Sequence, residues 1–284
     1  METRLQAVAG FVNLPLTKKY TTRLHHRIAR YRMKPDPSDK PDPIKGYGHP
    51  ERFEAKGFEH WVYKSETKNP PVIIMHELFG LTTECVALAD RIVAAGFRVY
   101  MPLFFGKPKK KRLFSGIRYC VSKEMYAFAG NCTSPIVDWL RALVGHVAKA
   151  EGTQRVGVIG MCLTGNFALT LIAETTVNAV VCCQPSLPFM RETGLAMARR
   201  DLDEAIAAAH KMDKPAIIGF RYEKDCICPA ARFKRIRREF GDAFDGEDLP
   251  GGGHSTLTGK KPHEGALADT IQYLKKRLLH EPAD

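Results

Sequence analysis

The feature that most constrains this chain is an abrupt change of pattern around Cys162. The apolar run V-G-V-I at residues 156–159 has the composition of a short buried strand. The small residues of G-M-C-L-T-G at residues 160–165 interrupt it, and a helical pattern follows over residues 163–173. Glycine permits the crowded backbone that such a change needs. The pattern therefore predicts a sharp strand-to-helix turn with a thiol at its tip.

A side chain at the tip of such a turn is well placed for nucleophilic chemistry. The common form of the motif is G-x-S-x-G; here Cys162 takes the place of the serine and Thr164 that of the second glycine. The dipole and free N–H groups of the following helix favour a thiolate. A structural cysteine on a glycine-punctuated turn fits the same pattern, so other parts of the chain must decide between the two.

The remaining sequence alternates short apolar runs with longer helical patterns. We expect strands at residues 60–63, 71–77, 98–101, 156–159, 178–184, 215–220 and 243–249, the first of them in an N-terminal hairpin. We expect further helices at residues 84–95, 135–150, 201–212, 230–240 and 263–279. The predicted fold class is α/β, a mostly parallel sheet of about seven or eight strands covered by helices on both faces.

Two loop residues stand where a thiol nucleophile needs its partners. Such a site requires a base and an acid that orients it. Asp225 follows the strand expected at residues 215–220, and His254 lies in the loop P-G-G-G-H-S at residues 250–255. Each is common in loops, but both follow strand ends, where open α/β sheets place their sites. In the chain order nucleophile, acid, histidine, we predict the catalytic residues Cys162, Asp225 and His254.

The loop after residues 71–77 supplies the other predicted parts of the site. An oxyanion hole uses the N–H of the residue after the nucleophile, Leu163, and one from the loop after an early strand. Leu78, in H-E-L-F-G, is the expected second donor. Glu77 places a carboxyl group at the end of this strand, aimed toward the site. The alternative interpretation of Glu77 is an acid at a helix N-terminus.

These segments resemble the dienelactone hydrolases (carboxymethylenebutenolidases), α/β-hydrolases with a Cys-Asp-His triad. The matching segments are E-L-F-G at 77–80, G-M-C-L-T-G at 160–165, D-C-I-C-P at 225–229 and G-H-S at 253–255. The resemblance covers roughly residues 50–280 and implies an α/β-hydrolase fold. It also implies a functional Glu77, because the family's glutamate lies beside the thiol and is implicated in activating it on substrate binding.

The substrate contacts depart from the family pattern. Its best-known members hold a substrate carboxylate with arginines, one of them a few residues after the catalytic histidine, whereas S-T-L-T at 255–258 offers none. Lys260 and Lys261 are the nearest cations, and lysine lacks the bidentate geometry of arginine. We take Lys260 and Phe79 as candidate substrate contacts. A helical insertion predicted at residues 187–212 would shape a different pocket.

Composition is that of an ordinary soluble enzyme, with 284 residues, 44% hydrophobic and 26% charged. No run approaches the ~20 apolar residues of a membrane span, and the N-terminus lacks a secretory apolar region and cleavage site. The eight cysteines fall mostly within expected strands and helices, which favours reduced thiols and a cytoplasmic location. Neither Cys182–Cys183 nor Cys226–Cys228 has the spacing of structural zinc ligands, so we expect no metal and no cofactor.

The net charge of +12 is unevenly distributed. Residues 1–50 carry ten Lys and Arg against four Asp and Glu, and end in a proline-rich linker. We therefore predict a basic N-terminal extension over residues 1–50 and a hydrolase domain over residues 51–284. Further basic runs at residues 107–112 and 232–238 fit either solvated faces or attraction of anions. No nucleic-acid motif accompanies the charge; the extension would serve membrane-surface contact, self-association or packing on the hydrolase body.

The favoured hypothesis is a hydrolase that cleaves an activated carboxylic ester or lactone through a thioester on Cys162. Its partner would be a small molecule, and the basic charge favours an anionic one. One alternative is another acyl substrate, such as a thioester. The other is a catalytically degenerate α/β-hydrolase that binds a ligand or a membrane surface. The sequence makes no prediction of oligomeric state.

Overall fold

The computed structural model of this chain describes residues 40–67, 70–109, 133–187 and 193–279. Most of the predicted N-terminal extension, the end of the basic run at 107–112, part of the predicted insertion, and Cys120 and Cys132 lie outside these ranges. What the sequence predicts for those residues remains a prediction.

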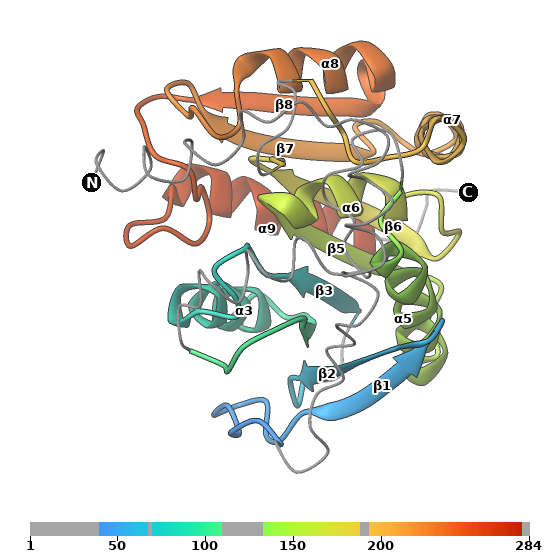
Figure 1. The fold of residues 1–284 in the computed structure, drawn as a ribbon, viewed down its shortest axis with the longest axis vertical. Coiled ribbons are helices and arrows are strands. Elements are labelled where there is room, and N and C mark those ends of the chain that lie inside the picture. Colours follow the sequence, from blue (N-terminus) through green and yellow to red (C-terminus); the bar gives the residue numbers. More distant parts are fainter. Residues whose placement is uncertain (1–39, 68–69, 110–132, 188–192, 280–284) are drawn as a thin grey trace, which may run out of the picture. The chain divides into compact units, whose positions relative to one another are not determined.

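Eight strands form one sheet in the order β1-β2-β4-β3-β5-β6-β7-β8 (Figure 1). β1 (Glu51–Ala55) and β2 (Phe58–Lys64) form an antiparallel hairpin, and β2 also pairs antiparallel with β4 (Arg98–Leu103). All other neighbours pair in parallel and include β3 (Pro71–Met75), β5 (Val156–Met161), β6 (Val177–Cys183), β7 (Ile217–Tyr222) and β8 (Phe244–Leu249). The predicted α/β class, with a hairpin leading into a mostly parallel sheet, is confirmed.

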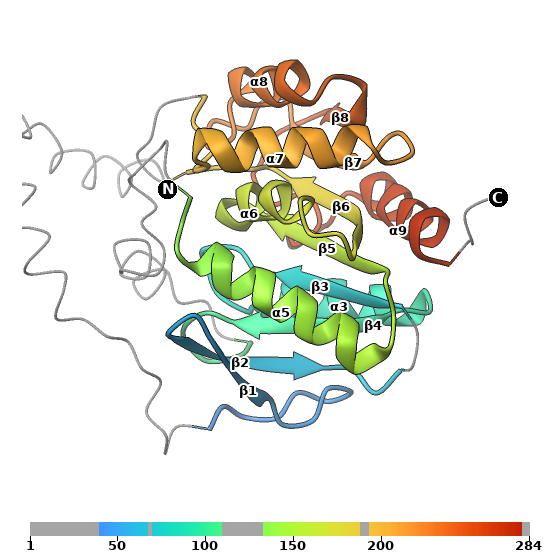
Figure 2. The ribbon, with the colours of Figure 1, turned by 90° about the vertical axis from the view of Figure 1, so that its right-hand side faces the viewer.

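Helices cover both faces of the sheet because its central strands are apolar on both sides. Every residue of β3 and β5 is buried. On one face lie α3 (Thr83–Ala94) and α9 (Glu264–Leu278); on the other lie α5 (Ile136–Glu151), α6 (Leu163–Leu171), α7 (Arg199–His210) and α8 (Ala230–Phe240) (Figure 2). Each face therefore has its own hydrophobic core, and the sheet is the shared wall between them.

The helices begin and end within two residues of the predicted bounds. Local signals explain this agreement. Thr82 caps α3, its hydroxyl accepting the N–H of Cys85 at 3.3 Å. Gly152 ends α5 in the left-handed region, with φ 61° and ψ 35°.

The end of the predicted N-terminal extension packs against α3 and β2. Ile44 and Tyr47 are buried. The hydroxyl of Tyr47 donates to Asp90 in α3 at 3.1 Å, and that of Tyr63 in β2 donates to the carbonyl of Asp42 at 2.6 Å. The chain thus makes specific contacts with the domain before β1 begins.

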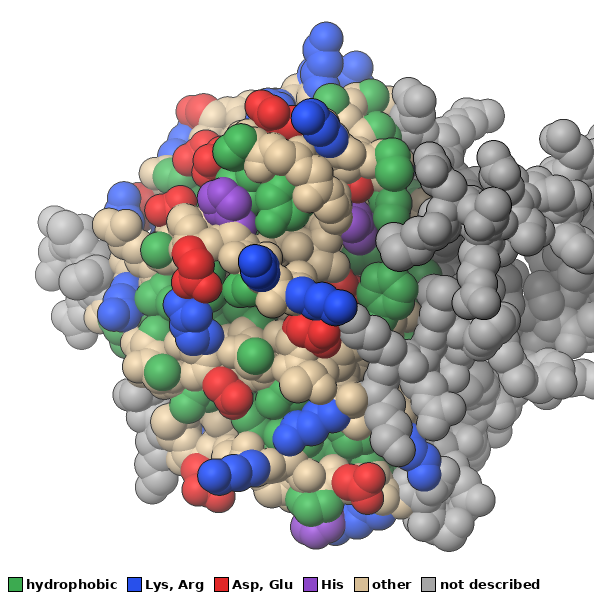
Figure 3. Space-filling view, turned by 90° about the vertical axis from the view of Figure 1, so that its left-hand side faces the viewer, with side chains coloured by type: hydrophobic (Ala, Val, Ile, Leu, Met, Phe, Trp, Pro, Cys, Tyr) green, Lys and Arg blue, Asp and Glu red, His purple; other side chains and the backbone are tan. Residues whose placement is uncertain are grey.

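The basic run at residues 232–238 is divided between internal contacts and the surface, where Lys234 and Arg238 are exposed. Arg232 is buried and donates to the carbonyl of Gly194 at 2.7 Å, while Arg237 pairs with Asp248 at 2.9 Å. On the face shown in Figure 3, Lys and Arg side chains are interspersed with Asp and Glu. In the part of the chain that is described, no helix combines the length and apolar character needed to cross a membrane.

Gly160 is the position where the turn after β5 leaves no room for a side chain. A Cβ there would lie 2.2 Å from the carbonyl oxygen of Thr164 and 2.8 Å from the Cβ of Ala168. We expect Gly160→Ala to lower the free energy of unfolding by about 2–3 kcal/mol, because backbone atoms must shift. Urea unfolding followed by circular dichroism measures this.

Gly145 provides the matched control in the middle of α5. It is exposed, and a Cβ there would meet no atom within 4 Å. Gly145→Ala should raise stability by roughly 0.5–1 kcal/mol, since alanine favours the helix. A Gly160→Ala protein as stable as Gly145→Ala would contradict the crowding argument.

Candidate active site

Five parallel strands end at one edge of the sheet and bring the candidate residues together there. Cys162 follows β5, Asp225 follows β7 and His254 follows β8. Glu77 follows β3, and Ser186 follows β6. The carboxyl ends of parallel strands share an edge, so segments far apart in the sequence meet at this point.

Cys162 sits at the tip of the predicted strand-to-helix turn in a constrained backbone conformation. Its φ of 59° and ψ of −123° are unusual for a residue with a side chain. Main-chain hydrogen bonds hold it: its N–H donates to the carbonyl of Cys183 at 3.1 Å, and its carbonyl accepts from Gly165 at 3.1 Å and from Ser186 at 3.0 Å. The turn therefore fixes the direction in which the thiol points.

Thr164, which replaces the second glycine of the motif, ties the turn to the neighbouring strand. Its hydroxyl accepts the N–H of Met161 at 2.9 Å and lies 3.0 Å from the carbonyl of Met75, at the end of β3. A glycine could make neither contact. The departure from the motif thus carries a structural role.

Asp225 and His254 form the predicted acid–histidine pair. The Nδ1 of His254 lies 2.8 Å from Oδ2 of Asp225. The other oxygen, Oδ1, accepts the N–H groups of Ile227 at 2.8 Å and Cys228 at 3.0 Å. Asp225 is 4% exposed, and a carboxylate can only accept hydrogen bonds. Nδ1 of His254 therefore carries a hydrogen and donates a hydrogen bond to Oδ2.

The environment of His254 favours its protonated form. Burial opposes protonation, but the hydrogen bond to Asp225 and the nearby Cys162 thiol outweigh it and raise the pKa of His254 to about 10. Its Nε2 is buried and makes no hydrogen bond of ordinary geometry to any described residue. Because Nδ1 is bonded to Asp225, Nε2 is the nitrogen of His254 that remains for an interaction with Cys162.

Leu78 and Leu163, the predicted oxyanion donors, both keep their N–H groups available. Neither donates to an acceptor within residues 40–67, 70–109, 133–187 and 193–279. Two hydrogen bonds to its carbonyl oxygen fix the orientation of the Glu77–Leu78 peptide. The carbonyl of Glu77 lies 2.8 Å from Nδ1 of His76 and accepts the N–H of Gly80 at 3.0 Å. In a trans peptide the N–H points away from the carbonyl, so the Leu78 N–H faces away from His76.

His76, which the sequence analysis did not single out, acts as a neutral ring in this loop. Its Nε2 accepts the N–H of Phe104 at 3.2 Å, so Nδ1 is the protonated nitrogen that donates to Glu77. Burial lowers the pKa of His76 to about 4. The one sequence signal for this role is that His76 directly precedes the E-L-F-G segment.

Glu77 lies at the same edge and joins three loops. Its Oε1 accepts from Nε2 of Gln184 at 2.7 Å, and its Oε2 accepts from the Ser255 hydroxyl at 2.8 Å. Gln184 in turn accepts from the Thr256 hydroxyl at 2.6 Å. The carboxylate is thus held by the loop after β6 and by the histidine loop. It is not the helix cap of the alternative interpretation, because Thr82 caps α3.

The Ser186 side chain is in direct contact with the thiol. Its Oγ lies 3.0 Å from Sγ of Cys162, and its side chain is buried. Ser186 follows the strand expected at residues 178–184, but nothing in the sequence marked it as a partner of Cys162.

The two candidate substrate contacts, Lys260 and Phe79, are not tied to the candidate triad. Lys260 is exposed, and Phe79 is half-buried in the loop after β3. Among the described residues, neither makes a hydrogen bond or ion pair with the triad. Their assignment to a substrate remains a prediction.

The other thiols differ from Cys162 in setting. All six cysteines that the structure describes are free thiols. Burial raises the pKa of four of them. The pKa of Cys183 rises to about 12, and those of Cys85, Cys182 and Cys228 rise well above the usual range. Cys226 is exposed. Thiolate chemistry at neutral pH is therefore suppressed at the four buried sites.

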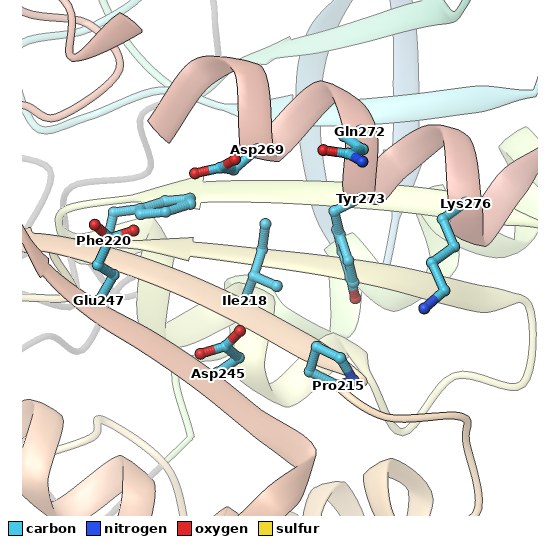
Figure 4. Close-up of a pocket in the computed structure, with 9 residues that line it drawn as sticks. All are labelled: Pro215, Ile218, Phe220, Asp245, Glu247, Asp269, Gln272, Tyr273 and Lys276. Carbon is cyan, nitrogen blue, oxygen red and sulfur yellow. The ribbon is translucent and has the colours of Figure 1, made fainter. Parts of the chain in front are cut away.

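A cavity of ≈ 290 Å³ lies elsewhere, between α9 and the strands β7 and β8. Figure 4 shows Asp269, Gln272, Tyr273 and Lys276 reaching from α9 toward the strand residues that line it. No residue of the triad contributes to its wall. Across the described segments no cluster of His, Cys, Asp or Glu side chains is arranged to hold a metal ion.

The sheet order, the turn at Cys162 and the edge that gathers its partners define an α/β-hydrolase. The sequence profile of the dienelactone hydrolase family matches residues 58–276, and the chain belongs to that family. No curated protein matches the chain.

Solved structures share the fold at low sequence identity. A Klebsiella pneumoniae protein assigned as a dienelactone hydrolase is 17% identical with a TM-score of 0.59, covering 82% of this chain and 98% of its own. A cold-adapted esterase from an Arctic intertidal metagenomic library is 14% identical with a TM-score of 0.58, covering 84% and 97%. The Pyrococcus furiosus esterase Pf2001 is 10% identical with a TM-score of 0.56, covering 85% and 100%. At these identities the likeness establishes the fold.

The raised pKa of His254 predicts how stability changes with pH. A folded-state pKa of about 10 lies above the ordinary ~6.5. The group therefore contributes stability fully below pH ~6.5 and loses it as the pH rises toward 10. Asp225→Asn removes the charge that holds the proton, so stability should fall less over this window than in the unchanged protein. Urea unfolding at intervals from pH 6 to 10 measures the difference.

Asp269→Asn is the control for this series, because Asp269 is exposed on α9 and away from the triad. Its stability should follow the unchanged protein at every pH. Parallel curves for Asp225→Asn and Asp269→Asn would show that Asp225 does not hold the His254 proton.

Proposed function

We propose that this protein hydrolyses an activated carboxylic ester or lactone, with Cys162 as nucleophile and His254 and Asp225 as its partners. The observation that carries the proposal is the Nδ1–Oδ2 contact of 2.8 Å between His254 and Asp225 at the edge where the turn presents Cys162. Family membership supports hydrolysis in general terms. Residues 51–284 would form the catalytic domain, and residues 1–50 a basic extension.

The acylation step begins from a thiolate and an imidazolium. The raised pKa of His254 favours this arrangement of the proton at neutral pH. The Cys162 sulfur forms a bond to the substrate carbonyl carbon, and the carbonyl electrons move to oxygen, which the N–H groups of Leu78 and Leu163 stabilise. When the intermediate collapses, the C–O bond to the leaving group breaks and His254 gives that oxygen its proton.

The deacylation step uses the neutral His254 that acylation leaves behind. It takes a proton from water while the water oxygen attacks the thioester carbon. The C–S bond then breaks, Cys162 leaves as a thiolate, and the acid product departs. Thiolates are good nucleophiles and good leaving groups, which suits activated enol esters and lactones better than amides.

Glu77 is proposed to act on Cys162 through its charge. Its carboxylate is fixed by Gln184 and Ser255 at the edge that holds the thiol. The family's glutamate is implicated in thiol activation on substrate binding, and Glu77 occupies the matching motif. In the free enzyme this charge would limit idle oxidation of the thiol.

The substrate is proposed to be a small molecule, and an anionic one if Lys260 contacts it. The free thiols of the described residues suit a reducing compartment, and we propose a cytoplasmic location. A degenerate, ligand-binding hydrolase is the competing function, and the triad geometry argues against it.

Replacing the nucleophile tests the proposal directly. Cys162→Ala should reduce turnover of p-nitrophenyl acetate and of a dienelactone by at least about a thousandfold, because no covalent intermediate can form. The fold should persist, as judged by circular dichroism. Mass spectrometry of the intact protein should detect the acyl-enzyme in the unchanged protein and not in the variant.

Cys226→Ser is the matched control, since Cys226 is an exposed thiol that contacts no triad side chain among the described residues. It should retain turnover. Near-normal activity in Cys162→Ala would overturn the mechanism. Absence of turnover in every protein, with alkylation spread over all cysteines, would favour the ligand-binding alternative.

Glu77→Gln separates the charge of Glu77 from its hydrogen bonds. Ser255→Ala removes one hydrogen bond but keeps the carboxylate. If the charge acts on the thiol, Glu77→Gln should slow single-turnover acylation about tenfold or more, and Ser255→Ala should slow it much less. Stopped-flow release of p-nitrophenol measures both. Equal rates in the two variants would assign Glu77 a positioning role only.

A further inference from the structure

Hydrogen bonds of its backbone hold Ser186 beside Cys162. Its N–H donates to the carbonyl of Cys162 at 3.0 Å, and its own carbonyl accepts from Nδ2 of Asn166 at 3.0 Å. Asn166 also reaches the carbonyl of Leu163 at 3.2 Å, one residue after the nucleophile. These hydrogen bonds tie the loop after β6 to the turn after β5.

The Ser186 hydroxyl is directed at the sulfur. Oγ lies 3.0 Å from Sγ, and within the described part of the chain it makes no other hydrogen bond. Ser186 is 1% exposed and Cys162 7% exposed, so water does not replace this contact readily. A hydrogen bond to a charged acceptor is strongest in such a buried setting.

The direction of this hydrogen bond follows from where the proton of the pair resides. In the proposed mechanism acylation starts with the proton on His254, and the sulfur is then an acceptor without a hydrogen of its own. A serine hydroxyl can donate to it, and an aliphatic side chain of the same size could not. Ser186 is thus able to stabilise the charged sulfur with a donor separate from His254.

We propose that Ser186 is a further catalytic residue, whose hydroxyl donates a hydrogen bond to the Cys162 thiolate. This inference rests on the proposed function, in which Cys162 is the nucleophile. The sulfur of a thioester is a weak acceptor, so the hydrogen bond weakens when the C–S bond forms. It returns when that bond breaks during deacylation, where the hydroxyl stabilises the departing thiolate.

Other titratable groups interact electrostatically with Cys162, and they must stay constant in a test. They are His254 from the loop after β8, Cys228 just before α8, and Arg232 in the first turn of α8. Ser186→Ala changes none of these. A difference between this variant and the unchanged protein therefore reports the hydroxyl.

The experiment measures the rate of alkylation of Cys162 by iodoacetamide from pH 4 to 10, by mass spectrometry of the peptide that contains it. Peptide analysis separates Cys162 from the exposed Cys226. In Ser186→Ala the midpoint should rise by roughly one pH unit, which is about a tenfold lower rate below the midpoint. Ser186→Thr keeps a hydroxyl and should restore the original profile.

A profile in Ser186→Ala that is unchanged, or that moves to lower pH, would overturn the proposal; the second result would mean that Ser186 accepts a hydrogen bond from the neutral thiol. If Ser186→Ala fails to fold, Ser186→Gly removes the same hydroxyl. Deacylation of the acetyl-enzyme should also slow in Ser186→Ala and recover in Ser186→Thr. The alkylation profile does not depend on turnover, so it remains decisive even if Cys162→Ala retains activity and the proposed function fails.

Discussion

The main-chain pairing between the turn at Cys162 and the end of β6 is the interaction on which the rest of the site depends. The N–H of Cys162 reaches the carbonyl of Cys183, and its carbonyl receives the N–H of Ser186. These bonds lie just past Met161 and Cys183, the last paired residues of β5 and β6. Because they hold Cys162 at a positive φ, the backbone rather than the side chain decides where the sulfur lies.

Much of the fold could be predicted because its signals are local. Gly152 ends α5, Thr82 begins α3, and apolar runs bounded by turn residues mark the buried strands. The positions of the candidate residues Cys162, Asp225 and His254 could also be predicted, since chain order and position after strand ends are properties of the sequence. Their meeting at one edge then follows from parallel pairing alone.

The contacts that refine the site could not be predicted in this way, because they depend on register between distant segments. Ser186 is an ordinary serine in the sequence, and only the alignment of β6 with β5 brings its hydroxyl to Cys162. Arg232 looked like one charge in a basic run, but its position on α8 turns it inward. His76 likewise becomes a support of the Glu77–Leu78 peptide only when Phe104, after β4, supplies its second partner.

The position of one proton links these contacts to the proposed chemistry. In the proposed mechanism acylation begins with the proton on His254 and a charged sulfur, and the buried setting requires donors to stabilise that charge. The imidazolium is then ready to protonate a leaving group but unable to activate water. It becomes a base only by giving its proton to the departing oxygen, so each acylation produces the base that the following hydrolysis needs. A substrate whose leaving group departs readily makes this exchange easiest, which agrees with the activated esters and lactones of the proposed function.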